Sequence, residues 1–510
     1  MRQRPGRRLL FDRQPVSLLA HIHIGKGVRA FPDFSCKPCM FPLFLVLILG
    51  ISYSLSIAPG LTWAHFSADG GDLISAAATG GVPHPSGYPL YMIVARGFQF
   101  LPFGDLAFRT NLLSAVCTIL TALLLYAYLL GQLRERSAAQ IASFLAALAY
   151  GLAPFVWGQA LVTEVYALHG LLLMLCLFVL SLEKSKASEW MRGFVFGIAA
   201  TNHLTALLIF PLLVLGYDGK LFGSRSVLLK RCLGVLCGLS LYLSLPVRAF
   251  FNPPVNWGDA STFDGFFWLI TGQLYRQYPF SLPLADVLQR LRAFGGFLLD
   301  QYTWLGALFG IYGLLSYPSR RMLIPTLWMG TVFLLFALFY GSLDSQVNLL
   351  PVWLAFAIWL AYGLQDLLAL FQARYKLQVS IAGLLFVALM IRIPSLLSSV
   401  DASDDLRARD FINHAAQVIP QNSLVFVDGD EQIFSLWYLQ FGLIQRTDMA
   451  IVAEGLLPYN WYRESLQDTY KNLHVPQRAK LQPADLAAAN PRRAICYISL
   501  DEPLVCVPVR

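Results

Sequence analysis

The sequence predicts a mostly α-helical protein that crosses a membrane many times and ends in a small soluble α/β domain. Hydrophobic residues make up 56% of the 510 residues and charged residues only 13%, whereas about a quarter of a soluble domain is charged. Several apolar runs reach the roughly 20 residues that a helix needs to span a bilayer. Beyond Pro394 the charges return and no run is long enough to span.

The charges give information about topology rather than about a partner. The formal net charge is +8, but the basic residues lie in short clusters between apolar runs, as in cytoplasmic loops of membrane proteins. We therefore expect no nucleic-acid partner. Residues 1–40 are basic, too long and polar for the start of a signal peptide, and without a clear cleavage site. We expect a cytoplasmic extension there; an overlong gene start before Met40 is the alternative.

The first span is predicted at Phe41–Ala58. The basic segment before it places the N-terminus in the cytoplasm by the positive-inside rule, so the following segment 59–105 is expected outside. Within that segment, Asp72–Thr79 fits a short helix that Gly80 ends. Tyr88–Leu101 is apolar but short, which favours an interfacial or re-entrant helix over a full span.

The middle of the chain contains one ambiguous span. Phe194–Gly216 has the length of a single span, but Asn202 and His203 lie at its centre. Two half-helices that meet at this pair near the outer side would keep the basic loop after it cytoplasmic, because broken helices are tolerated where they line an enclosed cavity. A single span would invert everything downstream. The preceding spans are expected at Ala107–Leu130, Ala139–Trp157 and Val165–Leu182.

The remaining spans complete a core over residues 41–395 with about 11 crossings. They are expected at Cys232–Val247, Leu305–Tyr317, Met322–Tyr340, Val347–Leu370 and Leu377–Ile393. The segment 248–302 is expected to be a long outer segment. An odd number of crossings places residues 396–510 outside the cytoplasm as a soluble domain. Its strands are expected at Ser423–Asp428, Met449–Ala453 and Arg493–Leu500.

Cysteine spacing supports one conditional prediction. Cys496 and Cys506 both lie in the polar tail and can form a disulfide if the tail is in an oxidising compartment. Cys36 and Cys39 have the CxxC spacing, but no second pair or histidine follows them, so chance explains the spacing better than metal or redox chemistry.

The unusual polar residues collect on the predicted outer side, where they form either a site or an ordinary set of loop residues. Asp69 and Asp72 are three residues apart, so they share a face if a helix begins there. Either carboxylate could simply cap that helix, and this reading is stronger for Asp72. Asp69 is the candidate general base. A metal site of Asp69, Asp72 and His84 matches no strong metal motif, so no metal is expected.

Other candidate residues flank the predicted spans. His84 lies in a turn that three prolines make rigid. Arg248 and Arg276 are candidates for holding a phosphate, although snorkelling to lipid head groups explains either one equally well. His203 in mid-span is harder to explain as a structural residue. Further candidates at or near the ends of spans are Tyr88, Glu164, Tyr166, His169 and Asn202.

Several motifs, taken together and in order, resemble one membrane family. They are Asp69-Gly-Gly-Asp72, VPHPSGYPLY at 82–91, WGQA from Trp157, EVYALH from Glu164, NHLT from Asn202, LPVR ending at Arg248, and NPPVNWGD ending at Asp259. This set is similar to a multi-spanning family, formerly a domain of unknown function, whose eukaryotic members are protein O-mannosyltransferases. The likeness is strong over residues 41–278 and loose beyond them.

The resemblance implies a GT-C-type glycosyltransferase fold, with a catalytic Asp in the first outer loop. It implies a polyprenyl-phosphate sugar as donor substrate, and no cofactor. Asp69 takes the catalytic position, and Asp72 stands where the family more often has Glu. We assign support or acceptor binding to Asp72, His84, Tyr88, Glu164, Tyr166 and His169. We assign donor phosphate binding to Asn202, His203, Arg248 and Arg276. Asn256, Trp257 and Asp259 are the remaining motif residues.

The expected function is therefore an inverting transfer of a sugar, mannose by resemblance, to a hydroxyl of a protein or lipid acceptor. The chain is expected in the plasma membrane of a prokaryote or the endoplasmic reticulum membrane of a eukaryote, in contact with membrane lipid, its lipid-linked donor and a protein or glycolipid acceptor. Two other classes remain open. One is a transporter or flippase of a lipid-linked sugar. The sequence shows no matched pair of interrupted helices in two halves, which counts against this class. The other is a non-catalytic subunit of a membrane assembly.

Overall fold

The computed structural model describes residues 40–133, 136–183, 187–214, 224–316, 320–478, 480–499 and 504–507. The chain divides into Met1–Cys39 and Met40–Arg510, and all described residues lie in the second unit. The predicted cytoplasmic extension, with Cys36 and Cys39, lies outside the described residues. The following account concerns Met40–Arg510.

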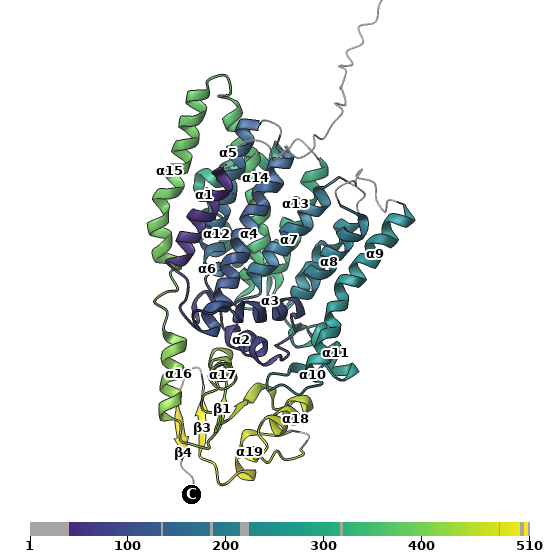
Figure 1. Ribbon diagram of the computed structural model, residues 1–510, viewed down its shortest axis with the longest axis vertical. Coiled ribbons are helices and arrows are strands. Elements are labelled where there is room, and N and C mark those ends of the chain that lie inside the picture. The colour runs from purple at the N-terminus through teal and green to yellow at the C-terminus, as the bar shows by residue number, and fades with distance from the viewer. Residues whose placement is uncertain are drawn as a thin grey trace, which may run out of the picture. The chain divides into compact units, whose positions relative to one another are not determined.

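A group of long apolar helices forms the core of this unit (Figure 1). The buried residues of these helices and of the segments between them belong to one hydrophobic cluster. The helices are α1 (Met40–Ser54), α4 (Leu106–Gln132), α5 (Arg136–Gly151), α6 (Pro154–Ala160), α7 (Tyr166–Ser181), α8 (Glu189–Asn202), α9 (Arg225–Leu239), α12 (Leu284–Leu315), α13 (Arg320–Phe339), α14 (Leu350–Ala369) and α15 (Tyr375–Val400).

Fewer helices than predicted are long and apolar enough to cross a membrane by themselves. Among the described residues there are four such helices, or up to five if the bent pair α5 and α6 forms one span. The predicted total of about 11 crossings is not confirmed, since several apolar helices are shorter than a full span. The four long stretches are Leu106–Gln132, Arg225–Ala249, Ser345–Ala369 and Tyr375–Val400, and the shorter ones are Met40–Ser54, Tyr166–Ser181, Leu204–Leu213 and Leu323–Phe339. The apolar helices still indicate an integral membrane protein.

Two predicted spans are broken or bent. The predicted span Ala139–Trp157 bends by 65° between α5 and α6, where Pro154 begins the second helix. The predicted break at Asn202 and His203 is present: α8 ends at Asn202, His203 is extended, and a 3₁₀ segment η2 (Leu204–Leu213) follows. The backbone N–H of Thr205 donates to the His203 ring, so this side chain caps the second half of the broken helix.

Short helices fill the two long segments beside the core. The segment 59–105 contains η1 (Ala64–Phe66), α2 (Gly70–Thr79) and α3 (Pro89–Gln99), close to the two helices predicted there. The segment 248–302 follows η3 (Ser240–Leu243), and α10 (Ser244–Ala249) runs into it. It contains η4 (Trp257–Asp259), α11 (Phe263–Ile270) and η5 (Gln273–Tyr275). α12 begins at Leu284, within this segment, and continues through a turn of the backbone at Thr303.

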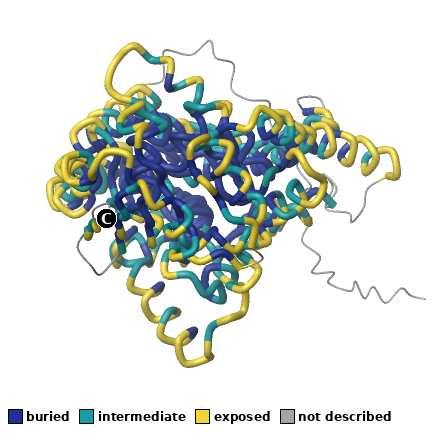
Figure 2. Tube along the Cα trace, turned by 90° about the horizontal axis from the view of Figure 1, so that it is seen from below, coloured by how far each residue is buried: buried dark blue, intermediate teal, exposed yellow. Residues whose placement is uncertain are grey.

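The C-terminal domain (396–510) contains a four-stranded sheet in the order β2-β1-β3-β4. The strands are β1 (Leu424–Val427), β2 (Ala450–Ala453), β3 (Ile495–Ile498) and β4 (Val505–Val507). β1 pairs in parallel with β2 and β3, and β4 is antiparallel to β3. All residues of β1 and β2 are buried, as expected for parallel strands that are covered on both faces. Across the unit, buried parts of the chain lie mostly inside and exposed parts mostly at the periphery (Figure 2). Three strands were predicted, and the three-residue β4 was missed.

Helices surround the sheet and connect its strands. They are α16 (Arg407–Val418), α17 (Asp430–Trp437), α18 (Asn460–Thr469) and α19 (Pro483–Ala489). Two short helical turns belong to the same domain: η7 (Tyr438–Gly442) follows α17, and η8 (Glu454–Leu456) follows β2. A further turn, η6 (Ser345–Leu349), precedes α14 in the core.

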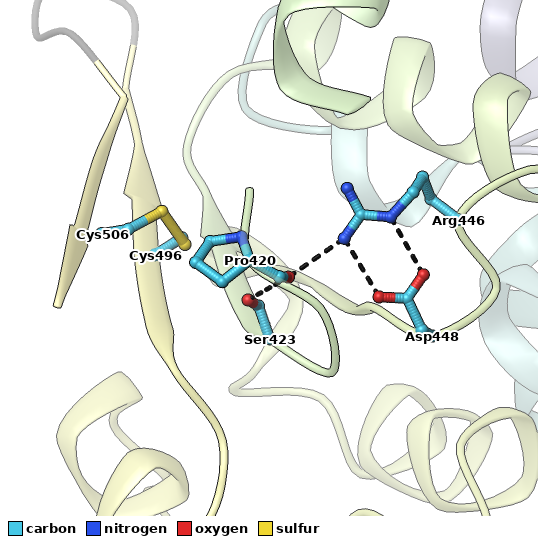
Figure 3. The surroundings of a disulfide bond; sticks show 6 residues. All are labelled: Pro420, Ser423, Arg446, Asp448, Cys496 and Cys506. Carbon is cyan, nitrogen blue, oxygen red and sulfur yellow. Dashed lines mark hydrogen bonds and ion pairs between the residues drawn. A yellow bond between two sulfur atoms is a disulfide. The ribbon is translucent and has the colours of Figure 1, made fainter. Parts of the chain in front are cut away.

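The disulfide predicted for the tail is present. Cys496 and Cys506 are direct partners in the β3–β4 ladder, and their sulfur atoms are bonded (Figure 3). Nearby, Arg446 forms an ion pair with Asp448 and donates a hydrogen bond to the Pro420 carbonyl at 3.0 Å. The disulfide holds the short strand β4 on the sheet. This link matters because three residues of ladder alone contribute little pairing energy.

The C-terminal domain is attached to the segment 59–105 by α17. At Gly71, the first turn of α2 lies so close to α17 that an added Cβ would be 2.1 Å from the Phe434 carbonyl oxygen. The Trp63 indole N–H donates to the Ser435 hydroxyl at 3.1 Å. The Thr62 hydroxyl donates to Asp405 at 2.6 Å. These contacts hold one helix of the domain against the start of α2, where the candidate residues Asp69 and Asp72 lie.

Candidate functional site

Asp72 is fully buried and both of its oxygens are occupied. The Trp257 indole N–H donates to one oxygen at 3.0 Å, and the His84 backbone N–H donates to the other at 3.0 Å. The His84 ring also donates from Nδ1 to this second oxygen at 2.7 Å. Asp72 is 0% exposed, so it positions the proline-rich turn and has no free oxygen for a substrate.

Asp69 differs from Asp72 in exposure and in partners. It occupies the N-cap position of α2, yet its side chain makes no capping hydrogen bond. Helix capping therefore explains neither the Asp69 nor the Asp72 side chain. The Asp69 side chain is 35% exposed, and its closest ionic neighbour is His84 Nε2 at 3.5 Å. Of the two carboxylates, only Asp69 can reach a ligand.

The ring of His84 lies between the two carboxylates and has both nitrogens engaged. Nδ1 donates to Asp72, and Nε2 lies 3.0 Å from the Tyr88 hydroxyl. That hydroxyl donates its own proton to the Pro85 carbonyl at 2.9 Å, so its oxygen accepts from Nε2. Two donating nitrogens define the imidazolium form. Burial lowers the pKa of His84, but Asp69 and the hydrogen bond to Asp72 outweigh it and raise this pKa to about 9.

Opposing effects set the pKa of Asp69. Burial by the surrounding chain raises it most, and the neighbouring His84 cation lowers it. The carboxylates of Asp430, Asp72 and Asp344 raise it again, and the resulting pKa is about 6. A carboxyl with this pKa is ionised at neutral pH and is still a stronger base than an ordinary Asp, which suits general base catalysis.

A glycine and a left-handed residue fix the turn that carries His84. Gly87 has φ +81°, and an added Cβ there would lie 2.8 Å from a methyl group of Leu245. Tyr88 follows with φ 40° and Pro89 begins α3. The backbone therefore reverses direction beside the start of α10 and turns the Tyr88 ring back onto His84. This local geometry explains why the sequence has Gly-Tyr-Pro after the histidine.

The NPPVNWGD motif supports the site from the other long segment. Val82, just before the proline-rich turn, forms a parallel bridge with Asn256, and the N–H of Trp257 donates to the Val82 carbonyl at 3.1 Å. This pairing delivers the Trp257 indole to Asp72. Asp259 instead accepts hydrogen bonds from Ser261. Within the described residues, no hydrogen bond or ion pair joins the Asp259 side chain to Asp69 or Asp72.

A second layer of rings lies beyond Tyr88. The Tyr88 ring is stacked on His203, with centroids 6.2 Å apart and planes 15° apart. His203 also contacts Tyr166 at 5.6 Å and His169 at 5.1 Å. The Thr205 hydroxyl lies 2.7 Å from His203 Nδ1 and 3.1 Å from His169 Nε2. The predicted residues of four separate motifs thus form one continuous group from Asp72 to His169.

Glu164 lies just before the start of α7, and Asn202 is the last residue of α8. Both side chains bond to the backbone of Val165. The Asn202 amide donates to the Val165 carbonyl at 3.2 Å, and the Val165 N–H donates to Glu164 at 3.3 Å. Burial and the nearby Asp69 raise the pKa of Glu164. Glu164 Oε1, Asn202 Oδ1 and His169 Nδ1 are buried and have no hydrogen-bond partner within the described chain. Because leaving such atoms unpaired is costly, they favour water or a ligand at this place.

The two arginines have other partners. Arg248 donates to the Gly81 carbonyl at 3.4 Å, just after the end of α2, where Arg96 donates to the Ala78 carbonyl at 2.8 Å. Arg276 is exposed and donates to the Thr271 hydroxyl at 3.1 Å. Neither guanidinium bonds to Asp69, Asp72 or His84 in the described structure, so their assignment to phosphate binding remains a prediction.

The C-terminal domain contributes residues that were not predicted. The Phe434 ring is stacked on His84, with centroids 6.4 Å apart and planes 18° apart. Asp430, one helical turn earlier, influences the pKa of both Asp69 and His84. The available signal was Asp428-Gly-Asp430 directly after a predicted strand, since ligands often bind at the carboxyl ends of parallel strands. Across the described ranges, no group of three or more His, Cys, Asp or Glu side chains is arranged to hold a metal ion.

Comparison with protein families gives two matches. Residues 69–222 match the model described as the N-terminal domain of protein O-mannosyl-transferase TMEM260, and residues 408–486 match TMEM260-associated domain 2. The chain is 27% identical over 451 residues to protein O-mannosyl-transferase TMEM260 of Mus musculus, which covers 80% of the chain and 62% of that protein. It is 21% identical over 507 residues to the tmem260 protein of Dictyostelium discoideum, which covers 86% of the chain and 60% of that protein.

The chain therefore spans about 60% of the length of these two relatives. Among solved structures, ArnT from Cupriavidus metallidurans bound to undecaprenyl phosphate has a TM-score of 0.55 at 13% identity, covering 90% of this chain and 92% of ArnT. The apo form of ArnT has a TM-score of 0.53 at 12% identity, covering 89% and 92%. At this identity the likeness shows the fold alone. Together the matches confirm the predicted resemblance to protein O-mannosyltransferases and to the GT-C fold.

Proposed function

We propose that this relative of the protein O-mannosyltransferases transfers mannose from a polyprenyl-phosphate donor to a hydroxyl of a protein or glycolipid acceptor, with Asp69 as the general base. The observation that carries the proposal is the difference in exposure and bonding between two carboxylates three residues apart. Asp72 is 0% exposed and fully bonded, whereas the Asp69 side chain is 35% exposed, next to a cationic His84. Such a pair supplies a rigid support and one accessible base.

In the proposed reaction, the acceptor hydroxyl oxygen attacks the anomeric carbon and forms the new glycosidic bond. The bond from that carbon to the phosphate oxygen breaks, and polyprenyl phosphate leaves with the bonding electrons. Asp69 takes the hydroxyl proton. A single displacement from the opposite face inverts the anomeric configuration. General base catalysis of this kind contributes about 10²- to 10⁴-fold to the rate.

An apolar groove beside the site supports a lipid-linked donor. It has a volume of about 460 Å³ and lies between η2, α9, η3 and α11. Its lining is almost entirely apolar: Ala200, Leu204, Leu207, Leu236, Leu239, Ser240, Tyr242, Leu243, Phe266 and Ile270. Leu204 follows His203 directly, so one end of the groove lies beside the ring layer of the site. A polyprenyl chain in this groove would bring its phosphate near His203, and the ArnT structure of the same fold holds undecaprenyl phosphate.

The proposed side of the membrane follows from the C-terminal domain. This domain contains the disulfide between Cys496 and Cys506 and packs on α2 beside Asp69. Disulfides persist in oxidising compartments. We therefore place the site and the C-terminal domain on the extracytoplasmic side, which is the lumenal side in a eukaryote.

The proposal is tested with the purified chain in nanodiscs and polyprenyl-phosphate mannose labelled in the sugar. Label is expected to move onto protein or glycolipid acceptors from a membrane extract, with the anomeric configuration inverted, and none is expected from a nucleotide-linked mannose alone. Repeating the assay in sealed vesicles separates transfer from translocation. Labelled lipid that crosses the bilayer while no acceptor is labelled would identify a flippase and overturn the proposal.

The rate of transfer is expected to fall as the pH drops through about 6. The pKa of Asp69 is about 6, and below it the carboxyl carries a proton and cannot accept another. Replacing His84 by Asn removes the cation that lowers this pKa, so the acidic limb of the pH profile should move to higher pH by about one unit or more. An acidic limb that moves to lower pH in His84→Asn would contradict the assignment.

A further inference from the structure

The C-terminal domain supplies the candidate site with a carboxylate, Asp430, that pairs with no residue of the described chain. Asp430 is the first residue of α17, and its side chain is exposed. It makes no hydrogen bond or ion pair within the described parts of the chain. The exposed or half-exposed carboxylates of Asp405, Asp448 and Asp485 in the same domain each pair with an arginine. Asp430 therefore has free acceptor oxygens.

The helix that carries Asp430 is held in a fixed position over the site. Phe434 is four residues further along α17, so Asp430 and Phe434 lie on one face of the helix, a turn apart. The Phe434 ring is stacked on His84, and the Phe434 carbonyl lies against Gly71. Asp430 consequently faces the region of Asp69 and His84. Its charge raises the pKa of both residues, as expected of a carboxylate within electrostatic range.

Strand topology supports the same assignment. β1, β2 and β3 are parallel, and β1 leads from its carboxyl end through Asp428 and Gly429 into α17. Ligands of open α/β sheets bind outside the carboxyl ends of their strands. In this protein the carboxyl end of β1 leads directly to the candidate catalytic residues.

A buried carboxylate oxygen near Asp69 also has no hydrogen-bond partner within the described chain. Glu164 is 2% exposed, and burial and the charge of Asp69 raise its pKa. Its Oε1 has no hydrogen-bond partner within the described chain. A ligand with several hydroxyl groups would satisfy such atoms. Because Asp69 must reach the acceptor oxygen that attacks the anomeric carbon, the transferred sugar must lie within about one ring width of Asp69.

We propose that Asp430 binds hydroxyl groups of the donor sugar, so that the C-terminal domain forms part of the sugar subsite. The proposal rests on the proposed function, since it requires a sugar-phosphate lipid at Asp69. A carboxylate accepts hydrogen bonds from two neighbouring hydroxyls at once. The bare lipid phosphate has no such hydroxyls, so the role of Asp430 is confined to the sugar.

The test compares the binding of polyprenyl-phosphate mannose with that of bare polyprenyl phosphate to the full chain in nanodiscs. Asp430→Asn is expected to weaken binding of the mannosyl lipid about tenfold, as typical for losing a charge-assisted hydrogen bond. Binding of the bare lipid should be unchanged or slightly tighter, because a negative charge near an anionic phosphate is removed. The matched control is Glu431→Gln, which removes the neighbouring carboxylate about 100° around the same helix and should bind both lipids as the wild type does.

The outcomes separate this inference from the proposed function. If the wild type binds neither lipid, the proposed donor is wrong. If the wild type prefers the mannosyl lipid and Asp430→Asn retains the full preference, only the role of Asp430 is overturned. Equal weakening for both lipids, or an equal effect of Glu431→Gln, would likewise overturn the role of Asp430 in sugar binding.

Discussion

Replacing Asp69 by Asn is expected to lower the rate of mannose transfer by about 10²- to 10⁴-fold. The substitution keeps the size and shape of the side chain but removes its ability to accept a proton. Because the side chain is 35% exposed and makes no capping hydrogen bond, folding should be nearly unaffected. The measurement is the initial rate of label transfer from polyprenyl-phosphate mannose, together with the thermal unfolding midpoint in the same nanodiscs.

Asp72→Asn is the matched comparison, three residues away. It replaces a buried carboxylate that accepts from Trp257 and His84, so it should lower the unfolding midpoint as well as the rate. Removing one partner of a buried charge-assisted hydrogen bond costs about 1.5–3 kcal/mol. If Asp69→Asn transfers mannose at the wild-type rate, Asp69 is not the base. If both variants lose stability equally, the separation of their roles is wrong.

Replacing Gly71 by Ala is expected to disrupt the contact between α2 and α17. The added Cβ would lie 2.1 Å from the Phe434 carbonyl oxygen. That neighbour is backbone rather than the flexible end of a side chain, so α17 must move as a unit. Overpacking of this kind costs about 1–3 kcal/mol. We expect at least a tenfold loss of transfer, because Phe434 and Asp430 leave His84, and faster hydrogen exchange in α17.

Gly97→Ala provides the control for Gly71→Ala. Gly97 also lies in a short helix of the segment 59–105, but nothing lies within 4 Å of an added Cβ there. Since Ala favours a helix over Gly by about 1 kcal/mol, this variant should be as active and at least as stable as the wild type. Wild-type transfer and unchanged exchange of α17 in Gly71→Ala would show that the domain does not need this contact.

Local sequence patterns predicted the secondary structure better than the number of crossings. The helices α4 and α14 begin and end near their predicted bounds, because apolar length and flanking charges define them locally. α15 begins near its predicted start but continues to Val400, beyond the predicted end at Ile393. The prediction of about 11 crossings counted full spans and shorter broken helices alike. The 65° bend between α5 and α6 was not predicted, although Pro154 lies where the second helix begins.

The same difference separates the residues of the candidate site. The resemblance pointed to Asp69, Asp72, His84 and Trp257, but spacing alone could not say which carboxylate is free. That depends on Trp257, which is 185 residues from Asp72 in sequence. Arg248 and Arg276 matched phosphate chemistry by residue type, yet they donate to Gly81 and Thr271. The hydrogen-bond partners of these arginines depend on the folded path of the backbone, which residue type alone does not show.

The sequence by itself predicted a membrane protein that resembles the protein O-mannosyltransferases, because apolar run lengths and ordered motifs are local properties. It also predicted three of the four strands of the tail and the disulfide between Cys496 and Cys506. Only the tertiary structure decided that Asp72 is a support and Asp69 is accessible. It alone placed α17, with Asp430 and Phe434, at the same site. The physical reason is that accessibility and pKa depend on which distant groups displace water from a side chain, and those groups are brought together only by folding.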